Sequence, residues 1–145
     1  MTTVAAILKH KGYQVTSVDP TLTIAGVVNV LSEHRIGAVL VVDRAQQLLG
    51  IVSERDIVRC LAANGAATLE MTAGQLMTRA LQHAHPETTV SEAMGKMTVG
   101  RFRHMPVMER DKLVGLISIG DVVKARIMEQ EGEVDSLRAY VAGSV

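Results

Sequence analysis

The sequence predicts an α+β fold made of two copies of one β-α-β-β-α unit. The first observation is an internal repeat, since residues 15–61 match residues 81–127 in a constant order. The second is that the apolar spacing in each copy changes from helical to that of short β-prone runs. The third is size: one copy is too small to bury both a sheet face and its helices, so the two copies are expected to pack with pseudo-two-fold symmetry.

The helices and strands of each copy follow from local patterns. The first helices, near residues 24–31 and 90–97, carry apolar residues on one face and are preceded by the N-cap residues Thr23 and Thr89. Runs 37–42 and 104–108 end in charged turns and are followed by return strands 48–52 and 113–117, which predicts two hairpins. Ser53 and Ser118 then open helices over residues 56–62 and 121–128.

These elements give a provisional domain organisation. Residues 1–14 form an N-terminal helix and lead-in, 15–63 the first unit, 64–80 a connector, 81–128 the second unit and 129–145 a helical tail. The pairs that carry the repeat keep their order along the whole unit: Pro20 and Pro86, Arg35 and Arg101, Gly50 and Gly115, Ser53 and Ser118, Asp56 and Asp121.

Composition excludes several classes of function. Fifteen basic and fifteen acidic residues give no net charge, and aromatic residues are 2% of the chain, which argues against nucleic acid as a partner. The longest apolar run, residues 36–42, is far shorter than the roughly 20 residues that cross a membrane. Cys60 is the only cysteine, which is compatible with a reducing compartment, and we expect a cytoplasmic protein.

The strongest motif occurs twice, as Gly-x-x-Ser-x-x-Asp at residues 50–56 and 115–121. Together with the run at residues 101–107, it resembles the tandem CBS (cystathionine β-synthase) domain pair, or Bateman module, here without an attached catalytic domain. The resemblance covers almost the whole chain. It implies two clefts for an adenine nucleotide, with AMP the first candidate and then ATP, ADP or NAD(H), a homodimer, and a regulated partner protein that the sequence does not name.

The residue chemistry of the motif agrees with this resemblance. A serine at a strand-to-helix junction can offer its hydroxyl and nearby backbone N–H groups to a phosphate, and an aspartate one turn later can accept hydrogen bonds from ribose hydroxyls. The same Ser-x-x-Asp spacing is also that of a helix capping box. Ligand binding and capping therefore both stay open for Ser53 with Asp56 and for Ser118 with Asp121.

The second site is the richer in charge. Arg101, Arg103 and His104 lie close to it in sequence, and their alternation predicts that the two arginines share one strand face. Both arginines could instead be solvated surface charges. Met105 and Pro106 are candidate walls for an adenine ring.

The first site has fewer cations. Its candidate residues are Ser53, Asp56 and Arg55 at the helix start, with Thr16, Val18, Gly37, Ala38 and Val39 on the neighbouring strands. The small neutral residues at positions 37 and 38 predict a less phosphorylated ligand there, or one that uses Arg55.

Two other functions compete with nucleotide binding. An enzyme is disfavoured because neither serine has a nearby histidine and no phosphate-binding Gly-rich lysine motif occurs. His83 and His85 alternate and could hold a metal, yet no third ligand recurs at a fixed spacing, so we predict no metal and no catalytic cofactor. The second competitor is a structural module that dimerises through apolar helix faces and has no physiological ligand.

Overall fold

The computed structural model describes residues 1–79 and 82–143, without the side chains of residues 134–140 and 142–143. The chain forms two compact lobes. The first lobe is residues 14–81, and the second lobe joins residues 1–13 to residues 82–145. Leu81, where the second repeat copy begins, lies outside the described residues.

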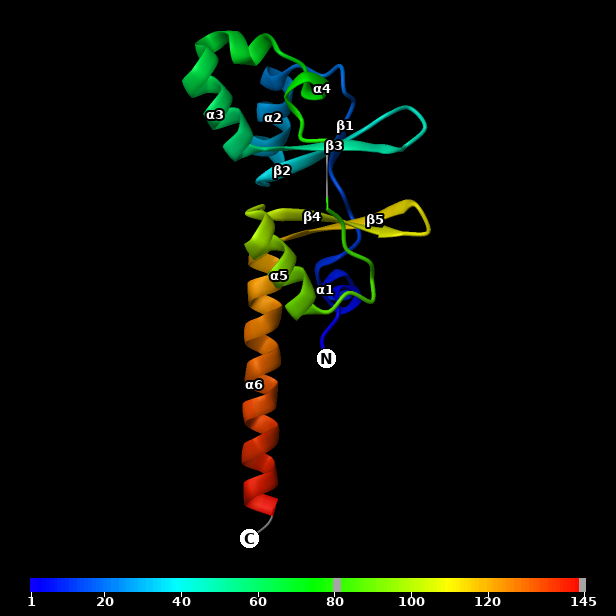
Figure 1. Cartoon of the computed structure of the whole chain (residues 1–145), viewed down its shortest axis with the longest axis vertical. Helices are drawn as coiled ribbons and strands as arrows, with labels where there is room; N and C mark the ends of the chain where they lie inside the picture. Colours follow the sequence, from blue (N-terminus) through cyan, green and yellow to red (C-terminus); the bar gives the residue numbers. More distant parts are fainter. Residues whose placement is uncertain (80–81, 144–145) are drawn as a thin grey trace. The chain divides into compact units, whose positions relative to one another are not determined.

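The first lobe has the predicted order of elements. A three-stranded sheet contains β1 (Ser17–Val18), β2 (Ala38–Val42) and β3 (Leu48–Ser53) in that order, with β1 parallel and β3 antiparallel to β2. Helices α2 (Ile24–His34) and α3 (Glu54–Asn64) follow β1 and β3 (Figure 1). The chain continues through the 3-10 helix η1 (Gly65–Glu70) to the short helix α4 (Ala73–Leu76). This confirms the α+β class and the β-α-β-β-α order.

The second lobe repeats this plan with a shorter sheet. Helix α5 (Val90–Gly100) precedes the antiparallel pair β4 (His104–Glu109) and β5 (Lys112–Ser118), and α6 (Ile119–Gly143) follows. The place of the first strand is taken by one parallel bridge, between Ala84 and Val107. Helix α6 runs on without a break through the tail that the sequence separates from it.

The structure confirms the predicted start of the first helix in each unit and moves the start of each later helix by two residues. The Oγ1 atoms of Thr23 and Thr89 accept hydrogen bonds from the backbone N–H groups of Gly26 and Glu92, which confirms both as N-caps. The later helices begin at residues 54 and 119 rather than at 56 and 121, because the preceding serine is itself the cap and the next residue is already helical.

The N-terminal helix α1 (Val4–Lys11) belongs to the second lobe, not to the unit that follows it in sequence (Figure 1). Val4, Ile7 and Leu8 are buried in the second lobe's core, beside Met105 and Ile117. The sequence indicates the helix but not this location, because no pattern within residues 1–14 says which copy its apolar face covers.

Equivalent hydrogen bonds attach α1 and α4 to their lobes. The Val4 backbone N–H donates to the Thr88 carbonyl at 2.8 Å, and the Ala73 N–H donates to the Leu22 carbonyl at 2.8 Å. The bridges just before these helices are likewise equivalent, with an antiparallel bridge from Thr3 to Thr89 in one lobe and between residues 23 and 72 in the other. The repeat therefore extends to the runs Thr-Val-Ala-Ala-Ile-Leu at 3–8 and Thr-Ala-Gly-Gln-Leu-Met at 72–77.

No helix within residues 1–79 and 82–143 is long and apolar enough to cross a membrane.

Candidate functional site

The first-lobe motif forms a complete capping box. The Asp56 backbone N–H donates to Ser53 Oγ at 3.2 Å, and the Ser53 N–H donates to Asp56 Oδ2 at 3.1 Å. The Ser53 hydroxyl also donates to Asp56 Oδ2, at 2.8 Å. The capping interpretation is therefore confirmed here, and it fixes the carboxylate at the junction of β3 and α3.

The second-lobe motif has the same reciprocal bonds. The Asp121 backbone N–H donates to Ser118 Oγ at 3.1 Å, and the Ser118 N–H donates to Asp121 Oδ2 at 2.8 Å. In both lobes the cap uses Oδ2 of the aspartate, so the cap does not need Oδ1. The capping role therefore leaves part of each carboxylate for another partner.

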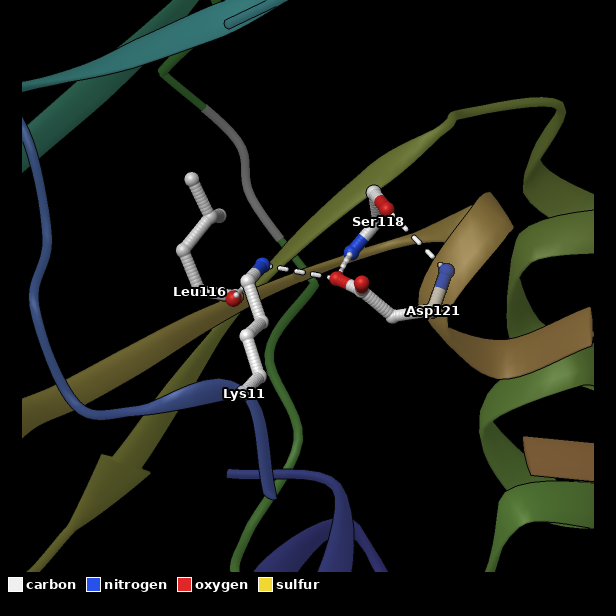
Figure 2. Close-up of polar contacts among 4 residues, drawn as sticks. All are labelled: Lys11, Leu116, Ser118 and Asp121. Carbon is white, nitrogen blue, oxygen red and sulfur yellow. Dashed lines mark hydrogen bonds and ion pairs between the residues drawn. The ribbon is translucent and has the colours of Figure 1, made fainter. Parts of the chain in front are cut away.

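Asp121 has an additional, cationic partner in Lys11, the last residue of α1. Figure 2 shows the Lys11 ammonium between two acceptors, Asp121 Oδ2 at 2.7 Å and the carbonyl oxygen of Leu116 at 2.8 Å. The side chains of Lys11 and Asp121 are 37% and 25% exposed, so the ion pair is only partly shielded from water. No local sequence pattern points to Lys11 as a site residue, because it lies 110 positions before Asp121.

The environment of Asp121 favours its charged form. Burial by itself raises the pKa of this carboxyl, but the hydrogen bond from Lys11, the bond from the Ser118 N–H and the positive charge of Lys11 together outweigh burial. The pKa of Asp121 is consequently below its ordinary value. Asp121 is thus an ionised hydrogen-bond acceptor at neutral pH.

The two lobes differ at the position that Lys11 occupies. In the first lobe the carbonyl of Ile51, the counterpart of Leu116, accepts a backbone hydrogen bond from Thr78 at 2.9 Å. There the chain leaves α4 as an extended segment, whereas α1 stays helical to Lys11 and its ammonium takes the acceptor instead. No ion pair involves Asp56 within the described part of the chain.

The predicted cationic residues lie next to the second motif, but not all on a strand. Arg101 is the C-cap of α5, with a left-handed backbone at φ 56°, and β4 begins only at His104. The expectation that Arg101 and Arg103 share a strand face is therefore wrong, because Arg101 ends a helix. The Arg103 carbonyl accepts a hydrogen bond from the Ile119 N–H at 2.7 Å, and His104 pairs in register with Ser118.

The corresponding backbone in the first lobe has the same connection. The Gly37 carbonyl accepts a hydrogen bond from the Glu54 N–H at 2.9 Å, and Ala38 pairs with Ser53 across the hairpin. The Thr16 carbonyl accepts from the Leu40 N–H at 3.1 Å. Residues 16, 37 and 38 thus lie on or beside the strands next to the first motif, and Arg55 is exposed on the first turn of α3.

Most of the predicted apolar walls belong to the core of their own lobe. Val18 and Val39 are part of the first-lobe core, and Met105 is fully buried in the second-lobe core. Pro106 is also buried, and its carbonyl accepts from the Ala84 N–H at 2.9 Å. These four side chains are therefore buried within their own lobe.

A groove of about 530 Å³ lies between α1 and α6 in the second lobe. Lys11 and Asp121 are among the residues that line it, together with apolar side chains and further charged groups. His10 and Lys124 line it without an ion pair to any described residue, while Glu129 is bound by Arg126 at 3.3 Å. The groove therefore leaves the ion pair accessible and places the Lys124 ammonium beside it.

The two histidines considered as metal ligands and the single cysteine all contact neighbouring residues. The rings of His83 and His85 meet edge to face with centroids 5.1 Å apart, and His85 Nδ1 lies 3.1 Å from the carbonyl oxygen of Met108. Within residues 1–79 and 82–143, no group of three His, Cys, Asp or Glu side chains could hold a metal. The Cys60 sulfur accepts a hydrogen bond from Asn64 Nδ2 at 3.3 Å.

Known proteins share this fold and sequence. The CBS domain family matches residues 4–63 and 73–128. CBS domain-containing protein CBSX3, mitochondrial, of Arabidopsis thaliana is 35% identical over an alignment 153 residues long, which covers 98% of this chain and 73% of CBSX3. The crystal structure of the CBS-domain containing protein ATU1752 from Agrobacterium tumefaciens is 44% identical with a TM-score of 0.84, over 86% of this chain and 99% of that one.

A third match is a ligand complex. The CBS domain pair of protein MJ0100, solved with 5′-methylthioadenosine and S-adenosyl-L-methionine, is 25% identical with a TM-score of 0.77, over 90% of this chain and 98% of that chain. The two family matches together include both Gly-x-x-Ser-x-x-Asp motifs, one in each lobe. The chain therefore belongs to the CBS domain family and contains a tandem CBS pair.

Proposed function

We propose that this protein is a regulatory module that binds an adenine nucleotide through its Ser-x-x-Asp motifs and transmits the ligand state to a partner protein. The observation that carries the proposal is the duplicated carboxylate geometry. Asp56 and Asp121 are both held through Oδ2 by the backbone N–H of the serine three residues earlier, at a strand-to-helix junction. A carboxylate fixed in this way is preorganised to accept hydrogen bonds from the two hydroxyls of a ribose.

The ligand class is supported by a relative. The MJ0100 pair binds 5′-methylthioadenosine and S-adenosyl-L-methionine, both of which contain adenosine. For this chain we propose AMP first, then ATP, ADP or NAD(H), because Arg101 and Arg103 are exposed cations close to the second motif. Guanidinium groups form strong, charge-assisted hydrogen bonds with phosphate.

The proposed role is regulatory and not catalytic. Each motif serine is engaged with its aspartate, since the Ser53 hydroxyl donates to Asp56 and Ser118 Oγ accepts from the Asp121 N–H, as in a helix cap and not as in an activated nucleophile. A ligand that binds one arrangement of the protein better than another shifts the population toward it, and a partner can recognise the change. We place this function in the cytoplasm, where a single unpaired cysteine such as Cys60 stays reduced.

Thermal unfolding with added ligands tests the proposal. The purified protein is heated alone and with AMP, ADP, ATP, NAD, NADH or S-adenosylmethionine. A ligand present at 100 times its dissociation constant stabilises the folded state by about 2.7 kcal/mol, which raises the midpoint by several degrees. The rise is expected to fall in Asp56→Asn and Asp121→Asn, and to persist in Glu131→Gln, which changes an exposed acid on α6. Equal midpoints with and without every ligand would refute adenine-nucleotide binding.

Dimerisation is the second candidate function, because one observation favours it. A groove of about 570 Å³ between α2 and α3 is lined by Val28, Leu31, Ile57, Val58 and Leu61, and Val58 is 64% exposed. Three of these apolar side chains are exposed together, Val28 at 37%, Val58 at 64% and Leu61 at 36%, and we propose that a second copy of the chain covers this patch. Light scattering tests this proposal. Val58→Lys should shift a dimer toward monomer, while Val99→Lys, at an exposed position of α5 outside this groove, should not.

A further inference from the structure

We infer that Lys11 makes the second-lobe motif selective for phosphorylated adenosine over the uncharged nucleoside. The inference rests on the proposed function and concerns one part of it, the discrimination between ligands at Asp121. Its basis is the short ion pair that joins Lys11 Nζ to Asp121 Oδ2 at 2.7 Å (Figure 2).

The carboxylate that is proposed to accept the ribose hydroxyls is already engaged by a cation. Asp121 Oδ2 accepts from both the Ser118 N–H and the Lys11 ammonium. A ribose that uses both carboxylate oxygens must share Oδ2 with Lys11 or displace it. An uncharged nucleoside gives the displaced ammonium no new counter-ion, and the carbonyl of Leu116 would be the remaining acceptor shown for it.

A phosphate changes this balance. Lys11 ends α1 on a long, flexible stem and its side chain is 37% exposed, so the ammonium can turn away from Asp121 without unfolding the helix. An anionic phosphate on the same ligand can then bind the ammonium while the ribose binds the carboxylate. A phosphorylated ligand thus replaces one ion pair with another, and an uncharged nucleoside cannot do so.

The surroundings of the ion pair favour an anion as well. The α1–α6 groove gives solvent access to Lys11 and Asp121, and Lys124 adds a positive charge that no described acid pairs. The first lobe offers a natural contrast, because Asp56 accepts from Ser53 and is in no ion pair with a described residue. Selectivity for phosphate is therefore assigned to the second lobe alone.

Calorimetric titration with adenosine and with AMP tests the inference. The experiment uses the full chain carrying Asp56→Asn, which removes the first-lobe carboxylate but keeps an N-cap partner for Ser53. In this background AMP is expected to bind at least about tenfold more tightly than adenosine. Lys11→Met should lower that ratio several-fold by strengthening adenosine binding and weakening AMP binding, and Lys11→Arg should restore it. Lys9→Met, an exposed change on the same helix, should leave the ratio unchanged.

Three other results of these titrations would each overturn a specific part of the proposal. An AMP-to-adenosine ratio that Lys11→Met leaves unchanged would overturn the role of Lys11 while leaving nucleotide binding intact. Binding that disappears in Asp56→Asn alone would place the ligand in the first lobe and overturn the inference in the same way. Absence of binding by either compound to the unmodified protein would overturn the proposed function itself. Thermal midpoints of all variants show whether each one is folded.

Discussion

The side chain of Leu8 lies directly against Gly115, so closely that a Cβ atom on the glycine would come within 2.7 Å of Leu8 Cδ2. The first lobe has the same relationship, since a Cβ atom on Gly50 would lie 2.7 Å from the sulfur of Met77. In each lobe the glycine that opens the motif is therefore the residue that lets a segment distant in sequence pack on the return strand. This is a packing role, separate from any contact with a ligand.

We expect Gly50→Ala to destabilise the protein more than Gly115→Ala. Overpacking a close contact costs about 1–3 kcal/mol. A Cβ on residue 50 would also lie 2.6 Å from the Thr78 carbonyl oxygen, which the Ile51 N–H holds in place, whereas the three atoms nearest to a Cβ on residue 115 all belong to the side chain of Leu8. Urea unfolding measures the difference.

The control for this pair is Gly95→Ala in α5. No heavy atom lies within 4 Å of the added Cβ, and alanine is about 1 kcal/mol more favourable than glycine inside a helix. Gly95→Ala should therefore stabilise the protein. A Gly50→Ala variant as stable as Gly95→Ala would contradict the packing role of Gly50.

We expect Leu8→Ala to cost about 2–5 kcal/mol of the free energy of unfolding, the usual range for a buried leucine. Leu8 is fully buried in the second-lobe core, although it lies more than one hundred positions before Ile117 in the sequence. Lys9→Ala, at an exposed position on the same helix, should change stability by less than about 0.5 kcal/mol. Equal effects of the two substitutions would show that α1 is not part of this core.

The Lys11–Asp121 pair predicts an acid-dependent contribution to stability. The pKa of Asp121 is lowered in the folded state, so its contribution is complete above the unfolded value of about 3.9 and is lost as the pH falls through the lower folded pKa. In urea unfolding, the stability difference between the unmodified protein and Asp121→Asn should be constant from about pH 7 to pH 5 and shrink below pH 4. A difference that grows toward acid pH would contradict the lowered pKa.

We expect Ser53→Ala to destabilise the protein by about 1 kcal/mol, because it removes the side chain that caps α3. Ser53→Thr should retain most of the stability, since its hydroxyl can accept from the Asp56 N–H. Ser32→Ala, an exposed serine inside α2, is the matched control and should be neutral or slightly stabilising. Chemical unfolding that ranks Ser53→Ala with Ser32→Ala would show that the cap adds nothing.

Features of this protein that depend on neighbouring residues could be predicted from its amino-acid sequence. The helices and the hairpin of each unit and the caps at Thr23, Thr89 and Ser53 follow from patterns a few residues long, and the structure confirms them, whereas the first strand predicted for the second unit is reduced to a single bridge. Each of these depends on hydrogen bonds and apolar spacing within one or two turns. The similarity of residues 3–8 to residues 72–77 is also present in the sequence. It can be recognised as part of the repeat only because α1 and α4 are attached to their lobes by equivalent hydrogen bonds.

The contacts between groups distant in the sequence became evident only in the folded chain. Folding placed α1 in the second lobe, packed Leu8 on Gly115 and joined Lys11 to Asp121 across 110 positions of sequence. It also put Arg101 at a helix end, in a left-handed conformation that local alternation does not reveal. The physical reason is that apolar burial and ion pairing depend on which surfaces are brought together in space, and a periodic pattern specifies that a face is buried without specifying its partner.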